Sequence, residues 1–176
     1  MMPEKTQIAV IGAGFSGVVT AAHLLRAGCS VTLINRSGRM ARGVAYGTNT
    51  PAHVLNVPAG RMSAFPDDED SFLRFARERD QTVTGGSFVS RSAYGEYLDR
   101  ILAEAEQNAP AKATLERIVG HVADIDVKSA GAASASLTLT DGRCIEADRV
   151  VLALGNFAPA DPPVTDRSCC SIAAMR

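Results

Sequence analysis

Apolar and polar positions in the first part of the chain predict a strand, a helix and a second strand. Residues 8–11 form a short, continuous apolar run, as in a buried strand. Apolar side chains then recur at helical spacing, at Val18, Ala21, Ala22 and Leu25. Gly28 follows as a helix-ending residue, and residues 30–34 form a second apolar run. This order is typical of a βαβ unit with a parallel sheet.

The middle of the chain contains a long irregular segment and two helical patterns. Residues 37–66 are rich in Gly, Pro, Asn and small side chains, and a loop of this length in a compact domain is usually functional. Residues 67–70 are all acidic and suit the start of a helix, whose apolar side chains follow at Phe72, Leu73, Phe75 and Ala76. Residues 91–106 predict a second helix with one apolar side: Tyr94, Tyr97, Leu98, Ile101 and Leu102.

The last third of the chain changes to strand patterns. We predict strands over residues 115–127, 135–140 and 144–147, with Asp141 and Gly142 in a tight turn, and together they form a small antiparallel meander. Residues 149–154 form a near-continuous apolar run, as in a buried parallel strand, and Gly155 ends it. A glycine there lets a ligand approach the end of the sheet, although a plain turn explains it as well.

The glycine pattern after the first strand is the most informative motif. Gly12, Gly14 and Gly17 follow the spacing G-x-G-x-x-G between a strand and a helix. The first glycine permits a tight turn, the second lets phosphates approach the backbone, and the third lets the helix pack closely. Unpaired N–H groups and the positive end of the helix dipole then face an anion. We therefore predict a pyrophosphate site at Gly12, Ala13, Gly14, Phe15, Ser16 and Gly17.

The end of the second strand carries the position expected to bind a ribose. Most sites of this kind place Asp or Glu there, about 20 residues after the glycines, to accept from the ribose hydroxyls. This chain has Asn35, whose amide oxygen accepts a hydrogen bond without the strength of a charged acceptor. We therefore expect weaker binding, not its loss. Arg36 follows and suits either the 2′-phosphate of NADP or an ordinary surface position.

Composition and charge narrow the class of protein. The 176 residues fit one domain with a real core, and the net charge of −1 favours neither nucleic acid nor a membrane surface as a partner. The apolar stretch over residues 8–25 contains glycines and polar side chains, so it fits a strand and helix better than a signal peptide or membrane span. The four cysteines include no C-x-x-C pair. We expect a cytoplasmic protein whose partner is a small-molecule cofactor, with its oligomeric state open.

No residue of the sequence qualifies as a catalytic group or a metal ligand. His23, His53 and His121 have no companions in a pattern typical of nucleophilic catalysis. The acids at 67–70 have no histidine or further carboxylate near them in sequence, so a helix start explains them better than a metal site. The catalytic residues are therefore unknown, and no metal site is predicted.

Five blocks of sequence together resemble a known family. They are residues 8–17, 41–48 (Ala-Arg-Gly-Val-Ala-Tyr-Gly-Thr), 55–59 (Leu-Asn-Val-Pro-Ala), 62–65 (Met-Ser-Ala-Phe) and 152–156 (Leu-Ala-Leu-Gly-Asn). These blocks resemble the N-terminal part of bacterial FAD/NAD(P)-binding proteins. That group includes FAD-dependent urate hydroxylase-like proteins and is related to flavin-dependent N-hydroxylating monooxygenases. The resemblance covers roughly residues 5–163.

The resemblance implies a Rossmann-like, FAD-binding α/β domain with the FAD pyrophosphate on the glycine loop. It implies that the flavin side is lined by Gly43, Val44, Tyr46, Leu55 and Asn56. It also implies that the backbone of Val122 meets the adenine, and that Ala153 and Gly155 pass near the ADP portion. NAD(P)H would then be the electron donor of a full-length enzyme.

The length of the chain departs from the family, whose members are generally longer and carry a second nucleotide domain. We expect residues 1–163 to form an incomplete FAD-binding domain, and residues 164–176 to be an unstructured or aberrant tail without a helix or strand pattern. The leading hypothesis is the FAD-binding portion of a flavin-dependent oxidoreductase or monooxygenase. The alternatives are a non-catalytic or truncated dinucleotide-binding module, and an NADP-dependent reductase that uses Arg36.

Overall fold

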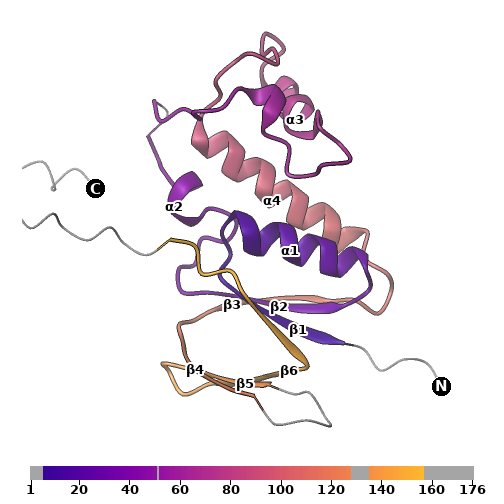
Figure 1. Cartoon of the computed structure of the whole chain (residues 1–176), viewed down its shortest axis with the longest axis vertical. Coiled ribbons are helices and arrows are strands. Elements are labelled where there is room, and N and C mark those ends of the chain that lie inside the picture. Colours follow the sequence, from indigo (N-terminus) through magenta and orange to yellow (C-terminus); the bar gives the residue numbers. More distant parts are fainter. Residues whose placement is uncertain (1–5, 51, 128–134, 157–176) are drawn as a thin grey trace, which may run out of the picture.

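The computed structural model describes residues 6–50, 52–127 and 135–156. These residues form three layers: helices, a four-stranded parallel sheet and a three-stranded antiparallel sheet (Figure 1). The helices cover one face of the parallel sheet, and the antiparallel sheet packs against the other. The predicted α/β fold, with a parallel sheet and a small meander, is confirmed.

The parallel sheet has the strand order β3-β2-β1-β7. Its strands are β1 (Gln7–Ile11), β2 (Ser30–Asn35), β3 (Leu115–Val119) and β7 (Arg149–Leu152). Alternate side chains of β1 face opposite layers, so Ile8 and Val10 join the helical core and Ala9 and Ile11 join the core under the meander. The strand order reverses between β1 and β7. Open α/β sheets bind ligands at such a point, beyond the carboxyl ends of the strands.

Two long helices cover the parallel sheet. The first, α1 (Phe15–Arg26), connects β1 to β2, and α4 (Arg91–Gln107) packs beside it. α4 begins where Ser90 Oγ accepts a hydrogen bond from the N–H of Ala93 (3.2 Å). The apolar side predicted for this helix is confirmed, because five side chains are at most 3% exposed: Tyr94, Tyr97, Leu98, Ile101 and Leu102.

The segment between β2 and α4 is more regular than its sequence indicates. It contains the short helix α2 (Gly43–Tyr46), the 3₁₀ turn η1 (Ala59–Arg61) and the helix α3 (Ser71–Arg79). α3 starts after the acidic residues, as predicted. Its Phe72 packs edge-on against Tyr94 of α4, with ring centroids 4.8 Å apart. This aromatic contact ties the segment to the helical layer.

The single strand predicted over residues 115–127 is wrong, because this stretch forms two strands in two different sheets. β3 runs parallel beside β2, and β4 (Val122–Val127) belongs to the meander. Gly120 makes the break: its N–H donates to Asn35 O (3.0 Å), and a Cβ there would lie 2.7 Å from Leu139 Cδ1. The alternation of side chains predicted the strands but did not indicate where the chain leaves one sheet for the other.

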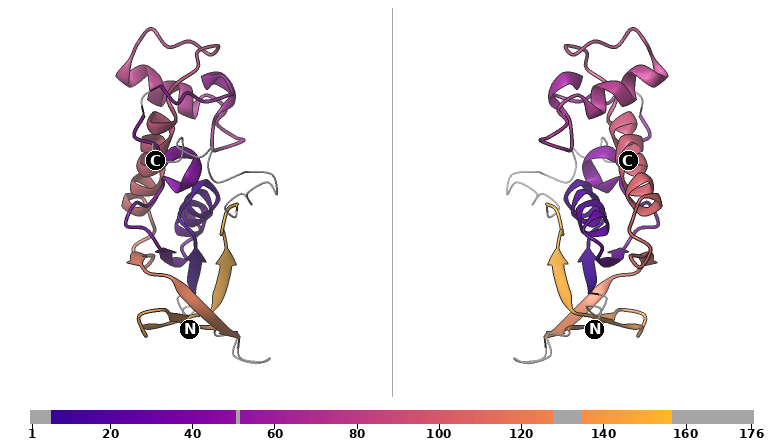
Figure 2. Two further views of the ribbon diagram at one scale, coloured as in Figure 1. Left: turned by 90° about the vertical axis from the view of Figure 1, so that its left-hand side faces the viewer. Right: turned by 90° about the vertical axis from the view of Figure 1, so that its right-hand side faces the viewer.

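The last two strands of the meander lie where the sequence pattern predicts them. β4 pairs antiparallel with β5 (Ala135–Leu139), and β5 pairs with β6 (Cys144–Ala147) across the predicted turn at Gly142. β7 lies beside the indigo β1 in Figure 2 and ends at Leu152 rather than at residue 154. The prediction that this strand is buried is wrong, because β7 forms an edge of the described sheet and Leu152 is 61% exposed. The tail predicted over residues 164–176 lies outside the described residues.

Candidate functional site

The glycine loop joins the end of β1 to α1 and is enclosed by the neighbouring strands. Gly12 has φ +102°, a left-handed conformation that favours glycine. Its N–H donates to Ile34 O of β2 (2.8 Å). A Cβ on Gly12 would overlap Ala153 O, just beyond β7. Both the turn and the packing therefore require glycine at position 12.

Gly17 and Gly14 differ in what they do for the fold. A Cβ on Gly17 would overlap Gly12 O, so only glycine lets α1 approach the loop this closely. Gly14 has φ −79°, which residues with side chains adopt readily, and a Cβ there would meet nothing closer than Gly43 Cα at 3.9 Å. The fold therefore gives no steric reason for glycine at position 14. The open side of this residue is where the motif is expected to receive phosphates.

The first turn of α1 is open to an anion. Gly14 is the N-cap residue, no side-chain hydrogen bond caps the helix within the described chain, and the first turn holds no acidic residue. Phe15 and Ser16 are exposed, whereas Ala13 is fully buried. Free N–H groups and the positive end of the helix dipole favour a negative ligand, so this helix start suits a pyrophosphate.

Asn35 ends β2 with its side chain turned to the following loop. Its Nδ2 donates to Ser37 O (2.9 Å), Ser37 Oγ (3.0 Å) and Arg39 O (3.3 Å). Arg39 in turn donates to Gly47 O (3.2 Å). The amide N–H groups thus organise the loop, which the sequence did not indicate, and the role of the amide oxygen toward a ribose stays a prediction. Arg36 is exposed, and its role toward a 2′-phosphate stays a prediction.

Ala153 and Gly155 follow β7 at the same end of the sheet. The N–H of Ala153 donates to Ile11 O (2.8 Å), which holds this part of the chain beside β1 and the glycine loop. Gly155 has φ +71°, and a Cβ there would meet no atom within 4 Å. A turn therefore explains this glycine, whose role near the ADP portion of a cofactor stays a prediction.

Gly43 brings the segment after β2 to the glycine loop. A Cβ on Gly43 would lie 3.2 Å from Gly14 Cα. Val44, next along α2, is 96% exposed. Tyr46 is half-buried and packs its ring against Tyr94, with centroids 4.6 Å apart. Burial raises the pKa of the Tyr46 hydroxyl, and Arg91 opposes this shift. Gly43 therefore lies at the loop, whereas the ring of Tyr46 packs against Tyr94 of α4.

The remaining residues predicted to contact the flavin or the adenine differ in burial. Leu55 is 3% exposed and packs in the helical core, and its N–H donates to Val89 O (2.8 Å). Asn56 beside it is exposed. Val122 packs its half-buried side chain in the core under the meander, and it is paired with Leu139 of β5. The cofactor roles of these three residues stay predictions.

Two charged residues that the sequence did not single out hold the segment around Gly43. Arg42 Nη1 donates to Ser92 O (3.0 Å), and Nη2 pairs with Asp99 Oδ2 on α4 (2.5 Å). Burial raises the pKa of the Asp99 carboxyl, and the paired Arg42 lowers it. Arg42 lies inside the sequence block that carries the family resemblance, which was a usable signal. Asp99 comes 57 positions later, and nothing near it in the sequence indicates this contact.

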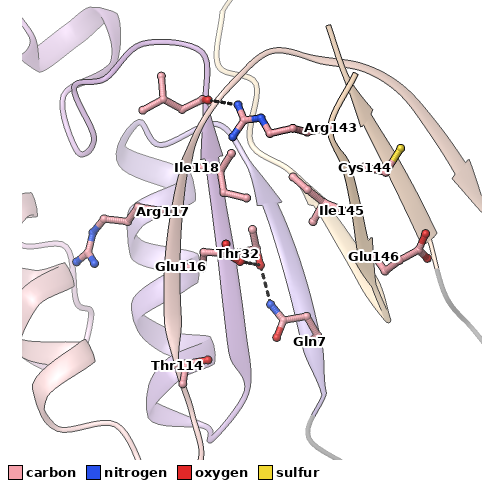
Figure 3. A pocket seen from close by; sticks show the side chains of 11 residues that line it. Gln7, Thr32, Thr114, Glu116, Arg117, Ile118, Arg143, Cys144, Ile145 and Glu146 are labelled. Atoms are coloured by element: carbon pink, nitrogen blue, oxygen red, sulfur yellow. Dashed lines mark hydrogen bonds between the residues drawn. The ribbon is translucent and has the colours of Figure 1, made fainter. Parts of the chain in front are cut away.

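A cavity of about 770 Å³ lies elsewhere, between β3 and β6. Figure 3 shows Ile118 and Ile145 facing each other across it. On its floor Gln7 Nε2 donates to Thr32 Oγ1 (2.6 Å), whose hydroxyl donates to Glu116 Oε2 (3.4 Å). These polar groups are bonded to one another, and no predicted cofactor residue lines this cavity. We therefore assign the candidate site to the glycine loop.

Residues 6–50, 52–127 and 135–156 show no sign of a metal site or a membrane-spanning helix. They contain no group of three or more His, Cys, Asp or Glu side chains that could hold a metal ion. None of their helices is long and apolar enough to cross a membrane. His53 Nδ1 lies 2.7 Å from Thr48 Oγ1, which also accepts from the N–H of Thr50 (3.1 Å). This histidine contact is therefore part of an exposed turn.

Comparison with protein families places nearly all of the described chain in one match. Residues 9–157 match the family model described as FAD-NAD(P)-binding. The matched range begins in β1 and includes the glycine loop, the segment around Gly43, the meander and β7. No curated protein matches the chain by sequence.

Solved structures share the fold at low sequence identity. A flavin monooxygenase from Stenotrophomonas maltophilia is 20% identical, with a TM-score of 0.60 over 92% of this chain and 43% of that chain. An oxidized steroid monooxygenase bound to NADP is 17% identical, with a TM-score of 0.61 over 92% of this chain and 28% of that chain. OTEMO in complex with FAD and NADP is 18% identical, with a TM-score of 0.57 over 89% and 27%. The chain thus spans less than half the length of each of these structures.

Proposed function

The chain belongs to the FAD-NAD(P)-binding family, and we propose that it is the FAD-binding portion of a flavin-dependent oxidoreductase or monooxygenase. The family match and the shared fold make it a dinucleotide cofactor-binding domain that resembles part of the flavin monooxygenases. We propose further that the bound dinucleotide is FAD and that NAD(P)H is the electron donor of a longer enzyme.

One observation carries the proposal, and it concerns Gly14. Gly12 and Gly17 are required by the fold, because a Cβ at either position would overlap backbone. Gly14 has an ordinary conformation and open space around a Cβ, so the fold tolerates a side chain there. A phosphate resting against the main chain is the physical reason for a glycine at this position. The uncapped first turn of α1 supports the same occupant.

The surrounding residues fit the rest of FAD. The N–H groups of Phe15, Ser16 and Gly17 would hold the pyrophosphate, and the amide oxygen of Asn35 would accept from the adenosine ribose. The exposed Val44 offers an apolar surface to the flavin side. When bound, FAD supplies the redox chemistry, and the residues of this chain bind and orient it.

Spectroscopy and titration of the purified chain test this proposal. We expect the protein either to carry flavin absorbance in the visible range or to take up added FAD, with tighter binding of FAD than of NAD or NADPH. A colourless protein that takes up no FAD would contradict the proposal. Tighter binding of NADPH than of FAD would favour a reductase that uses the exposed Arg36. Oxidation of NADPH by this chain alone would exclude a purely non-catalytic module.

A further inference from the structure

We propose that Arg42 is a positioning residue that fixes α2 to α4 and thereby holds Gly43 against Gly14, at the mouth of the glycine loop. This inference rests on the proposed function, because it concerns the shape of the same cofactor site. Arg42 precedes α2 directly and directs its guanidinium to α4, so the proposed role needs no contact with the cofactor.

The first observation is the way in which Arg42 is held. Its guanidinium donates to two groups of α4 at once, Ser92 O (3.0 Å) and Asp99 Oδ2 (2.5 Å). The Arg42 side chain is 21% exposed and that of Asp99 is 44% exposed, so the guanidinium is largely covered although its ion pair is partly open to water. Charge-assisted bonds from a planar guanidinium fix direction as well as distance. Arg42 therefore sets both the position and the orientation of the start of α2.

The second observation is the glycine of α4 beneath this contact. A Cβ on Gly95 would lie 2.6 Å from Arg42 Nη1 and 2.8 Å from Tyr46 O. Glycine is unfavourable in the middle of a helix, and Gly95 lies well inside α4. Its presence gives α2 the space to sit directly on the helix. Both ends of α2 thus depend on this one position.

The third observation is the backbone around Arg42. Ala41 has φ +59° and is fully buried, and Gly43 has φ +52°, so left-handed residues flank Arg42 on both sides. This region is unfavourable for alanine, and such a conformation persists only where the surroundings enforce it. The bonds from Arg42 to α4 supply this constraint. Because Gly43 follows directly, its approach to Gly14 is set by the same bonds.

Amide hydrogen exchange of the full chain without cofactor tests the mechanical part of the proposal. In Arg42→Gln we expect the hydrogen-bonded amides within residues 43–47, such as the Tyr46 N–H that donates to Arg42 O (3.1 Å), to exchange at least tenfold faster than in the wild type. Arg100→Gln is the matched control, because it removes another partly exposed ion pair of α4, with Glu78, which does not involve α2. Equal exchange of residues 43–47 in the wild type and in both variants would overturn the proposal.

The affinity for FAD tests the positioning role. We expect Kd to rise about tenfold in Arg42→Gln and to stay at the wild-type value in Arg100→Gln. Arg42→Lys should fall between them, since an ammonium cannot reproduce the fork-shaped contact. If Arg42→Gln binds FAD as the wild type does, despite faster exchange, a positioning role is excluded.

A second variant covers the case in which Arg42→Gln does not fold. Gly95→Ala keeps every charge but fills the space under Arg42 and Tyr46, and it removes an unfavourable helical glycine. We expect the same faster exchange at residues 43–47 and the same loss of affinity, and wild-type behaviour in both measurements would overturn the proposal. A wild-type chain that binds no FAD would refute the proposed function, whereas the exchange rates would still decide whether Arg42 holds α2.

Discussion

The glycine loop and the segment after β2 meet at Gly14 and Gly43, yet they are held in place by different means. Backbone packing fixes the loop, because Gly12 lies against Ala153 O and Gly17 lies against Gly12 O. Side-chain hydrogen bonds hold the part of the segment next to the loop, and those of Asn35, Arg39 and Arg42 are among them. An added Cβ in the loop would overlap backbone atoms that cannot move away, whereas a substitution in the segment removes one hydrogen bond and leaves the others. We therefore expect abrupt effects of substitutions in the loop and graded effects in the segment.

Gly17→Ala should have the largest effect, because the new Cβ would overlap the carbonyl oxygen of Gly12. We expect a loss of at least about 3 kcal/mol in the free energy of unfolding, seen by thermal or urea denaturation. Gly38→Ala is the control, since a Cβ there would meet no atom within 4 Å. If the two variants unfold alike, backbone packing does not fix the loop.

Gly14→Ala should separate cofactor binding from folding. The stability should stay within about 0.5 kcal/mol of the wild type, because the reduced freedom of the unfolded chain offsets a poorer N-cap. The affinity for FAD should fall at least about tenfold, equivalent to 1.4 kcal/mol, because the methyl group would occupy the space expected for phosphate. Isothermal titration and denaturation of the same sample measure both. Unchanged affinity would mean that the phosphates do not rest on Gly14.

Asn35→Asp tests whether the hydrogen bonds from Asn35 Nδ2 hold the segment after β2. From the motif alone, an aspartate should improve ribose binding, but it would also lose the Nδ2 donors and bring a carboxylate oxygen toward the carbonyls of Ser37 and Arg39. We expect a loss of about 1 kcal/mol in stability and no gain in FAD affinity. Asn35→Ala gives the effect of losing the donors without adding charge. Tighter FAD binding at full stability would show that the segment does not depend on this amide.

The pH dependence of Asp99→Asn should be the smallest effect. Burial raises the pKa of Asp99 in the folded chain, and Arg42 lowers it, with a net upward shift. An acid whose pKa is raised by folding contributes most to stability below the pKa of the unfolded state, and this contribution is lost as pH rises through the folded pKa. Asp99→Asn should therefore match the wild type in acid and equal or slightly exceed it at neutral pH.

Screening of this partly exposed pair keeps the expected difference below about 1 kcal/mol. Thermal denaturation of both proteins from acidic to neutral pH measures it. A variant that becomes steadily less stable than the wild type as pH rises would mean that ionised Asp99 stabilises the fold. In that case Arg42 would do more than position α2.

The loop could be predicted from the sequence because its causes are local. Gly12, Gly14 and Gly17 lie between a strand and a helix that the side-chain pattern already indicates, so the turn and the helix start follow from a few neighbouring positions. The use of Asn35 could not be predicted, since its partners depend on how the irregular segment folds back. The pairing of Arg42 with Asp99 depends on where α4 lies, 57 positions later.

The side-chain pattern predicts strands but does not predict which sheet each strand joins. Residues 115–127 have a continuous strand pattern, and the side-chain alternation is the same in a parallel and an antiparallel sheet. Only the packing of Gly120 under Leu139, together with its bond to Asn35, shows where the chain changes sheets. Local pattern thus predicted the elements, whereas contacts between distant residues decided their arrangement.

The contact between Gly12 and Ala153 also affects the order in which parts of the chain come together during synthesis. The ends of the described chain come together here, as in the bonds between Gln7 and Asp148, which are 141 positions apart. Contacts of such long separation form late in folding, and a ribosome releases the N-terminal end first. A nascent chain therefore carries its glycine motif long before β7 arrives to enclose it. A dinucleotide would therefore meet an enclosed glycine loop only after the chain has been synthesised beyond Ala153.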